Sequence, residues 1–272
     1  MLKAPPGACD CHMHVYDERY APDPRWPVPP PKAPAAAYRQ VQRELGLTRA
    51  VVVQPNAYAF DNRCTVDAIR ELGPLTRGVA TVPPDVTDVE LARLHEAGIR
   101  GARCYMLPNA FLAWDDVRLI AARVAPFGWH VQVQLDGREL PAHAALLAAL
   151  PTDVVIDHNG KYLVPVEPSD PAFVTLLQML DSGRTWVKLS APYETSQTGA
   201  PRYEDVSVLA RALVQRNPER CVWASNWPHP GQNPPPSSAA MLDLLLDWAP
   251  DAAVRDRILV DNPARLYGFG TI

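Results

Sequence analysis

The sequence predicts an α/β fold that forms a single (β/α)8 TIM barrel with proline-rich loops. Short apolar runs rich in β-branched residues recur eight times, a helical pattern follows each run, and polar residues stand where the runs end. Near-continuous apolar strands that alternate with helices indicate a parallel sheet covered on both faces. Eight such units in a chain of 272 residues are typical of a TIM barrel.

The eight predicted strands cover residues 8–15 (ACDCHMHV), 50–54 (AVVVQ), 78–82 (GVATV), 100–105 (RGARCY), 130–135 (HVQVQL), 153–158 (DVVIDH), 186–190 (WVKLS) and 221–225 (CVWAS). The predicted helices cover residues 35–45, 61–72, 87–97, 115–126, 138–149, 170–181, 203–216 and 238–248. A doubly wound open sheet is the alternative. The barrel is favoured because no G-x-G-x-x-G follows the first strand, and polar residues follow many strands rather than one switch point.

The 30 prolines concentrate in segments 22–34, 83–86 and 228–236. Disordered linkers are one interpretation of these segments. Stiff loops inside one domain are the favoured interpretation, because core-like patterns resume directly after each segment. We therefore expect a single domain over residues 1–272.

Composition narrows the class of protein. A net charge of −4 offers no overall positive field for nucleic acid or an anionic membrane, so a small molecule is the expected partner. The N-terminus lacks the apolar stretch of a signal peptide, and no run reaches the length of a membrane span. The five cysteines are odd in number and without metal-ribbon spacing, which predicts reduced thiols and a cytoplasmic location.

Three histidines stand at strand ends. His12 and His14 are two residues apart on the first strand, so both point to one face of it, and His158 ends the sixth strand. Imidazole groups suit zinc, so the three are candidate ligands of one divalent metal ion. The alternative is a set of core histidines held by backbone carbonyls. Three at strand ends favour a functional role.

Two cations are candidate anion ligands. Arg103 lies inside the fourth strand, where an unpaired buried charge is costly, so it needs a salt bridge to Asp136 or Asp157 or a substrate carboxylate. Lys161 follows the sixth strand and either pairs with a carboxylate or is solvated.

Other polar residues at strand ends and on the following loops are candidate substrate contacts: Asn56, Gln134, Tyr193 and His229. For Tyr193 and His229, loop packing is an equal alternative. His95 and His143 fall on helices and are expected to face solvent.

Several motifs together resemble the amidohydrolase superfamily from about residue 9 to 269: HMHV in the first strand, DH in the sixth, WPHP after the eighth and the terminal VDNPARLYGF. The stretches VQVQLDG, DHNGK and PYETS look like those of its lactone-acting branch, and more like its sugar-acid lactone isomerases than its pyrone-dicarboxylate hydrolases. The resemblance implies a TIM-barrel enzyme that acts on a lactone or a sugar acid.

The superfamily pattern implies metal ligands on the first, fifth, sixth and eighth strands. Here Gln134 replaces the fifth-strand histidine and Asn226 replaces the eighth-strand aspartate. The lactone branch is understood to work without a metal, so no cofactor is expected. His12, His14 and His158 would instead polarise the lactone carbonyl. The presence of His12 departs from the isomerases and leaves a single divalent metal such as zinc as the alternative, on the same three histidines.

Asn226 decides the reaction within the branch. An asparagine has no titratable proton acceptor, so the water-activating base of the hydrolases is missing. The resemblance therefore implies an isomerase in which a hydroxyl of the substrate attacks the lactone carbonyl, oriented by Asn226. Arg103 and Lys161 would hold one carboxylate.

Positions that match arginines of the hydrolases carry Pro108, Asn109 and Glu194, which disfavours a dicarboxylate pyrone. The alternatives are a lactone hydrolase, a related metal-dependent amidohydrolase or decarboxylase, and a non-catalytic binding barrel.

Overall fold

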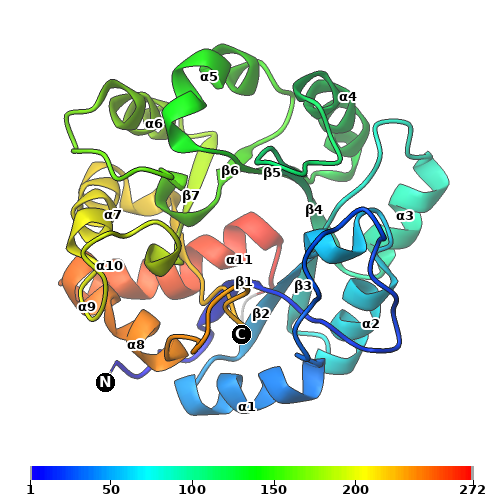
Figure 1. Ribbon diagram of the computed structural model, residues 1–272, viewed down its shortest axis with the longest axis horizontal. Helices are drawn as coiled ribbons and strands as arrows, with labels where there is room; N and C mark the ends of the chain where they lie inside the picture. The colour runs from blue at the N-terminus through cyan, green and yellow to red at the C-terminus, as the bar shows by residue number, and fades with distance from the viewer. Residues whose placement is uncertain (1, 271–272) are drawn as a thin grey trace.

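Eight parallel strands pair in chain order within residues 2–270, the part of the chain that the computed structural model describes (Figure 1). Their bounds are β1 Cys9–Met13, β2 Arg49–Val53, β3 Thr76–Ala80, β4 Ile99–Tyr105, β5 His130–Gln134, β6 Val154–Ile156, β7 Thr185–Leu189 and β8 Cys221–Trp223. Two backbone bonds join β1 to the segment after β8. The N–H of His14 donates to Trp227 (2.7 Å) and the N–H of Asn226 donates to His12 (2.9 Å). The predicted TIM barrel is confirmed.

The helices ring the sheet in Figure 1. Their bounds are α1 Ala35–Leu45, α2 Arg63–Leu72, α3 Asp88–Glu96, α4 Trp114–Val124, α5 Leu140–Ala148, α6 Pro171–Asp181, α7 Glu204–Arg216, α8 Ser238–Asp243, α9 Leu245–Trp248, α10 Ala252–Asp256 and α11 Asn262–Tyr267. Local chemistry sets their ends. Asp170 caps α6 by accepting from the N–H of Ala172, Pro171 fills its first position, and Gly46 ends α1 at φ 74°.

The apolar core has two parts. The larger cluster, with residues such as Val52, Ile69 and Ile156, lies between the strands and the helices. A smaller cluster takes the alternate strand positions, including Val51, Val53 and Val155, together with Tyr267 from α11. Because side chains alternate across a strand, this second cluster fills the lower barrel interior. The same alternation directs the later positions of the strands into the upper interior.

Several predicted strand ends are too long. The sixth strand ends at Ile156 rather than at residue 158, where His158 has a positive φ of 54° that takes the chain out of the sheet. The eighth strand ends at Trp223 rather than at residue 225. The predicted helix 238–248 is divided into α8 and α9 around Leu244. The predicted strands and helices are otherwise of the right kind, with errors at their ends, and α10 and α11 were not predicted.

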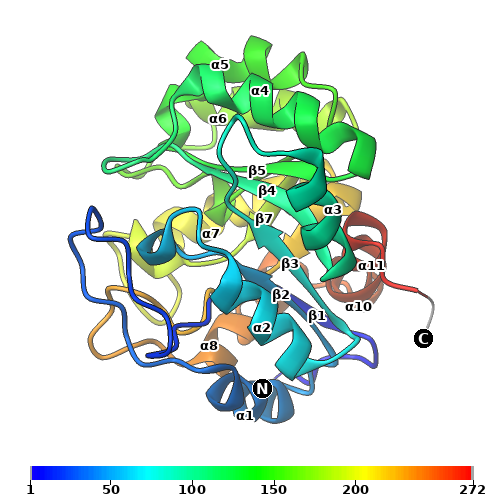
Figure 2. The same cartoon turned by 90° about the vertical axis from the view of Figure 1, so that its right-hand side faces the viewer.

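The proline-rich segments 22–34 and 228–236 form loops beside one another at the left of Figure 2. Both segments contribute to the wall of one cavity. All five cysteines are free and buried. In residues 2–270, none of the helices combines the length and the apolar character that crossing a membrane requires.

Candidate active site

A cavity of about 370 Å³ opens at the carboxyl ends of the strands, where TIM barrels carry their catalytic groups. Strand ends and the turns after them supply its polar floor: His14, Asn56, Arg103, Gln134, His158, Lys161, Glu194 and Asn226. The two proline-rich loops supply its wall: Trp26, Val28, Pro29, Pro30, Pro31, Pro230, Gly231 and Gln232. Seven of the ten predicted site residues therefore line one cavity; the exceptions are His12, Tyr193 and His229.

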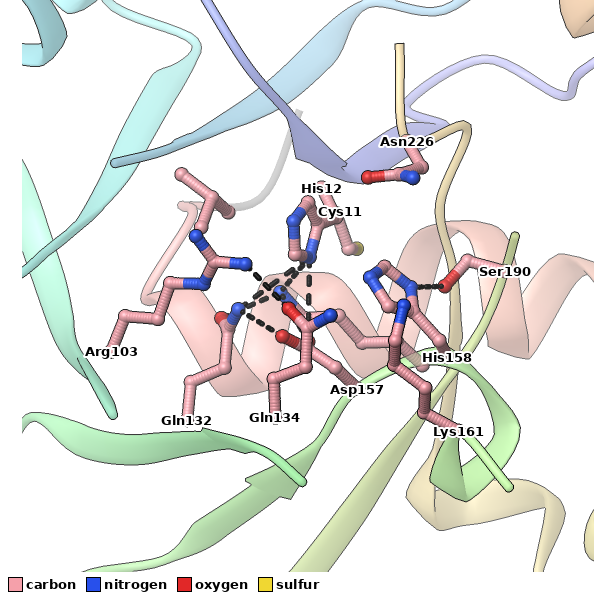
Figure 3. A network of polar contacts seen from close by, with 12 residues as sticks. Cys11, His12, Arg103, Gln132, Gln134, Asp157, His158, Lys161, Ser190 and Asn226 are labelled. Atoms are coloured by element: carbon pink, nitrogen blue, oxygen red, sulfur yellow. Dashed lines mark hydrogen bonds and ion pairs between the residues drawn. The ribbon is translucent and has the colours of Figure 1, made fainter. Parts of the chain in front are cut away.

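A buried polar network lies beneath the cavity floor (Figure 3). The ammonium group of Lys188 donates to Gln132 Oε1 at 2.6 Å and lies 3.7 Å from Asp157 Oδ1. Gln132 in turn donates to Asp157 Oδ2 at 3.0 Å. Burial lowers the pKa of Lys188 to about 8, so Lys188 is still mostly protonated at pH 7. The buried charge of Asp157 is thus compensated within the protein.

This network fixes the protons of His12 and His14. His14 Nδ1 lies 2.8 Å from the carbonyl oxygen of Val53, so Nδ1 carries the proton and donates it. Burial lowers the pKa of His14 to about 3, so its Nε2 is an acceptor at neutral pH. His12 Nε2, 3.2 Å away, therefore donates to it, and His12 Nδ1 accepts from Lys188 at 3.3 Å. Asp157 Oδ1 also lies 3.3 Å from His12 Nδ1, and with no proton on Nδ1 it has no hydrogen bond among residues 2–270, beside the ammonium group of Lys188.

His158 is the histidine with a ring nitrogen left for a ligand. Its Nδ1 lies 2.8 Å from the hydroxyl oxygen of Ser190 (Figure 3), and burial holds its pKa well below the usual value, so the ring is neutral. Its positive φ of 54° is costly for a residue other than glycine, and such backbone strain gathers at functional sites. In the tautomer in which Ser190 donates to Nδ1, the Nε2–H of His158 can donate into the cavity that this residue lines.

Arg103 is held by neutral groups. One guanidinium nitrogen donates to the carbonyl of Gln54 (2.9 Å) and to Asn56 Oδ1 (3.2 Å), and the other donates to Gln134 Oε1 (2.5 Å). Neither of the predicted salt bridges forms, because Asp136 pairs with Arg138 and Asp157 with Lys188. Within residues 2–270, Arg103 makes no ion pair, and its Nε has no hydrogen-bond partner. A buried, uncompensated guanidinium calls for an anion.

Lys161, Glu194 and Asn226 form a chain along one side of the cavity. Lys161 Nζ forms an ion pair with Glu194 Oε2, and Asn226 Nδ2 donates to Glu194 Oε1 at 2.8 Å. An ionised carboxylate only accepts, so this contact fixes which end of the Asn226 amide faces Glu194. The other end, Oδ1, is buried and has no donor among residues 2–270.

Tyr193 and His229 stand behind Asn226 and do not line the cavity. Asn226 Nδ2 lies 3.0 Å from the Tyr193 hydroxyl, which lies 2.9 Å from His229 Nδ1. His229 Nε2 in turn lies 3.0 Å from the Ser238 hydroxyl. The structure therefore gives these two predicted substrate contacts the role of holding Asn226 in place.

The metal-ligating groups that come together differ from the predicted set. Potential ligand atoms of His12, Asp157 and His158 lie within 4.8 Å of one another. Lys188, however, places an ammonium group 3.3 Å from His12 Nδ1 and 3.7 Å from Asp157 Oδ1. A metal ion on this nitrogen and oxygen would lie beside a positive charge. The residues therefore fit a metal ion poorly.

Buried neutral histidines predict acid lability. Burial lowers the pKa values of His14 and His130 to about 3 and that of His229 to about 4, against about 6.5 when unfolded. Between these values the unfolded chain binds more protons, so stability falls as the pH drops below about 6.5, by roughly 2 kcal/mol per histidine at pH 5. Urea unfolding at pH 7 and pH 5 measures this. His130→Gln should show a shallower pH dependence, and equal stabilities at both pH values would contradict the prediction.

Sequence reasoning left some residues without a role. Gln132, Lys188 and Ser190 received none, and Asp157 was considered only as a partner of Arg103. A lysine inside the apolar run WVKLS is a usable signal, since it must find a buried partner. His95 and His143 were wrongly placed in solvent; both are half-buried, His95 stacked on Trp129 and His143 on Trp114.

Comparisons with known proteins agree with this geometry. The family model described as amidohydrolase matches residues 9–269. The chain is 37% identical to a 2-pyrone-4,6-dicarboxylate hydrolase of Comamonas testosteroni, covering 98% of this chain and 92% of the relative. It is 34% identical to a D-galactarolactone isomerase of Agrobacterium fabrum, covering 98% and 93%.

A crystal structure of an Agrobacterium tumefaciens protein in the apo state superposes with a TM-score of 0.94 at 33% identity, covering 99% of this chain and 98% of that one. Sequence identity therefore accompanies the similar fold over nearly the full length of the chain. The chain is therefore an enzyme of the amidohydrolase family, beside relatives that are named for lactone chemistry.

Proposed function

We propose that the protein is a lactone isomerase that interconverts sugar-acid lactones by attack of the substrate's own hydroxyl on the lactone carbonyl. Relatives named for both lactone isomerisation and lactone hydrolysis support the substrate class. The observation that carries the choice of isomerisation is Asn226. Its amide lines the cavity at the position after β8, where a carboxylate would be needed to activate water.

The contacts of Glu194, a carboxylate that lines the cavity, support the same choice. Glu194 accepts from Asn226 through one oxygen and is ion-paired with Lys161 through the other. Both oxygens are engaged with donors, which lowers their basicity toward a water molecule. A hydrolase would need a free base at this place.

In the proposed reaction, a substrate hydroxyl oxygen forms a bond to the carbonyl carbon, and the ring carbon–oxygen bond then breaks. The proton of the attacking hydroxyl ends on the oxygen that leaves, so water is neither consumed nor released. The Nε2–H of His158 donates to the carbonyl oxygen as negative charge develops on it. Arg103 holds the substrate carboxylate, and Asn226, which lines the cavity, orients the attacking hydroxyl.

We also propose that the reaction needs no metal ion. The support is the Lys188 ammonium, which already neutralises Asp157 and donates to His12. His12 and His14 then act together as a hydrogen-bonded support for the cavity floor, with His158 as the donor to the substrate.

The proposal is tested by following aldarolactones by NMR with the purified enzyme. We expect one lactone to be converted into the other with a free acid at background level, and activity to survive treatment with a chelator. Ring opening without the second lactone would overturn the isomerase. About one equivalent of zinc or manganese, with loss of activity on chelation, would overturn the metal-free reaction.

A further inference from the structure

The two cationic side chains that line the cavity differ in whether an acidic group neutralises them. Within residues 2–270, two cations line it, Arg103 and Lys161, on opposite sides of the polar floor (Figure 3). Arg103 has only neutral partners, whereas Lys161 is ion-paired with Glu194. Among the ionised residues that line the cavity, the net charge is therefore that of one cation, carried by Arg103.

The ion pair between Lys161 and Glu194 is part of a hydrogen-bonded chain of side chains. Both side chains are nearly buried, with 10% and 16% of their surface exposed. Glu194 is also fixed by Asn226 Nδ2 at 2.8 Å, and Tyr193 anchors that amide from behind at 3.0 Å. A carboxylate held at both oxygens is not free to swing away when a ligand arrives.

We propose that Glu194 determines substrate specificity by closing the second anion site: it neutralises Lys161, so that the enzyme accepts lactones and acids with one carboxylate, bound at Arg103, and rejects dicarboxylates. This inference rests on the proposed lactone function and names the charge of its substrate. It revises the sequence-based prediction that Arg103 and Lys161 together hold the carboxylate.

The physical reason is that Glu194 repels a second carboxylate and already neutralises Lys161. A second carboxylate on the ligand that approached Lys161 would meet the carboxylate of Glu194, and bringing like charges together in a partly desolvated cavity is unfavourable. A hydroxyl meets no such penalty, because it donates to Glu194 and accepts from Lys161. The side of the cavity formed by Lys161 and Glu194 therefore suits the hydroxyls of a sugar acid.

Binding of matched acids tests the inference. The probes are two pairs that differ by one carboxylate: galactonate with galactarate, and 2-pyrone-6-carboxylate with 2-pyrone-4,6-dicarboxylate. Calorimetry gives the Kd of each acid for the wild type and for Glu194→Gln, whose amide oxygen still accepts from Asn226. Glu139→Gln is the matched control, because Glu139 is exposed and does not line the cavity.

We expect the wild type to prefer the single carboxylate in each pair that binds. In Glu194→Gln the preference should shift toward the dicarboxylate by about 10-fold or more, with the monocarboxylate Kd little changed. The double variant Glu194→Gln/Lys161→Met should lose this gain, because the freed ammonium is then absent. Glu139→Gln should behave as the wild type does.

An unchanged preference in a Glu194→Gln protein that melts normally and binds the monocarboxylate would overturn the inference, as would a wild type that prefers dicarboxylates or binds none of the four acids. Failure of the isomerase proposal shows separately, as hydrolysis in the turnover assay. The binding preference is measured at equilibrium without turnover.

Discussion

Asn226→Asp is expected to give the enzyme lactone hydrolysis, raising the rate of ring opening by roughly 10²-fold or more over the wild type. The substitution replaces an amide with a carboxylate of nearly the same shape at the wall of the cavity. A carboxylate at this place can take a proton from water, which the amide cannot do. Chromatography of the open acid alongside the two lactones measures both activities in one reaction.

The pH dependence of this variant follows from its neighbour. Glu194 Oε1, which accepts from the amide of Asn226 at 2.8 Å, would face a second carboxylate. Two carboxylates this close share a proton, which raises the pKa of the pair. Hydrolysis should therefore increase as the pH rises above the usual range of an aspartate. In Asn226→Asp/Glu194→Gln the repulsion is gone, so the increase should move to lower pH.

Asn226→Ala is the control for this prediction. It removes the amide that orients the hydroxyl and supplies no base, so isomerisation should fall and hydrolysis should stay at background. Ring opening by Asn226→Asp that stays at the level of the wild type would show that the amide is not what withholds water activation.

Arg103→Gln is expected to lower kcat/KM by roughly 10²- to 10³-fold, which corresponds to about 3–4 kcal/mol. Arg103 is the one cavity-lining cation in residues 2–270 without an acidic partner, so its charge is available to a substrate carboxylate. The carboxylate lies apart from the reacting carbonyl in the proposed reaction. The loss should therefore appear mainly in KM, with a smaller change in kcat.

Arg138→Gln is the matched control, because Arg138 is exposed, paired with Asp136 and outside the cavity. Arg103→Lys should restore only part of the loss, since an ammonium lacks the two-pronged geometry of a guanidinium. Thermal melting of Arg103→Gln should show a folded protein, because the change removes a buried charge rather than an ion pair. Wild-type kinetics in Arg103→Gln would remove Arg103 from the site.

The local sequence pattern predicted the barrel well. Each strand is marked by its own apolar run, and eight alternating strands and helices are compatible with few folds. The same pattern located Arg103, His158 and Asn226, since polar residues at strand ends must face the cavity. It placed the ends of strands less well, because the residue type of His158 does not signal its left-handed backbone at φ 54°.

The sequence did not predict which residues pair with the site residues. The pairing of Lys161 with Glu194, and of Lys188 with Asp157, joins residues that are 33 and 31 positions apart. Only the closed barrel brings them together. For Tyr193 and His229 the sequence indicated a place on loops but could not tell whether they face the substrate or support Asn226. The proton positions of His12 and His14 likewise follow from contacts with Val53 and Lys188.

The most direct test of the central claim, that the substrate supplies the nucleophile, is isomerisation in water enriched in oxygen-18. Mass spectrometry of the product lactone reports where its oxygens come from. Intramolecular attack predicts a second lactone without the label at every time point, with unlabelled starting material remaining. Label in the product lactone at the rate of its formation would show that water opens the ring first, and would contradict the account.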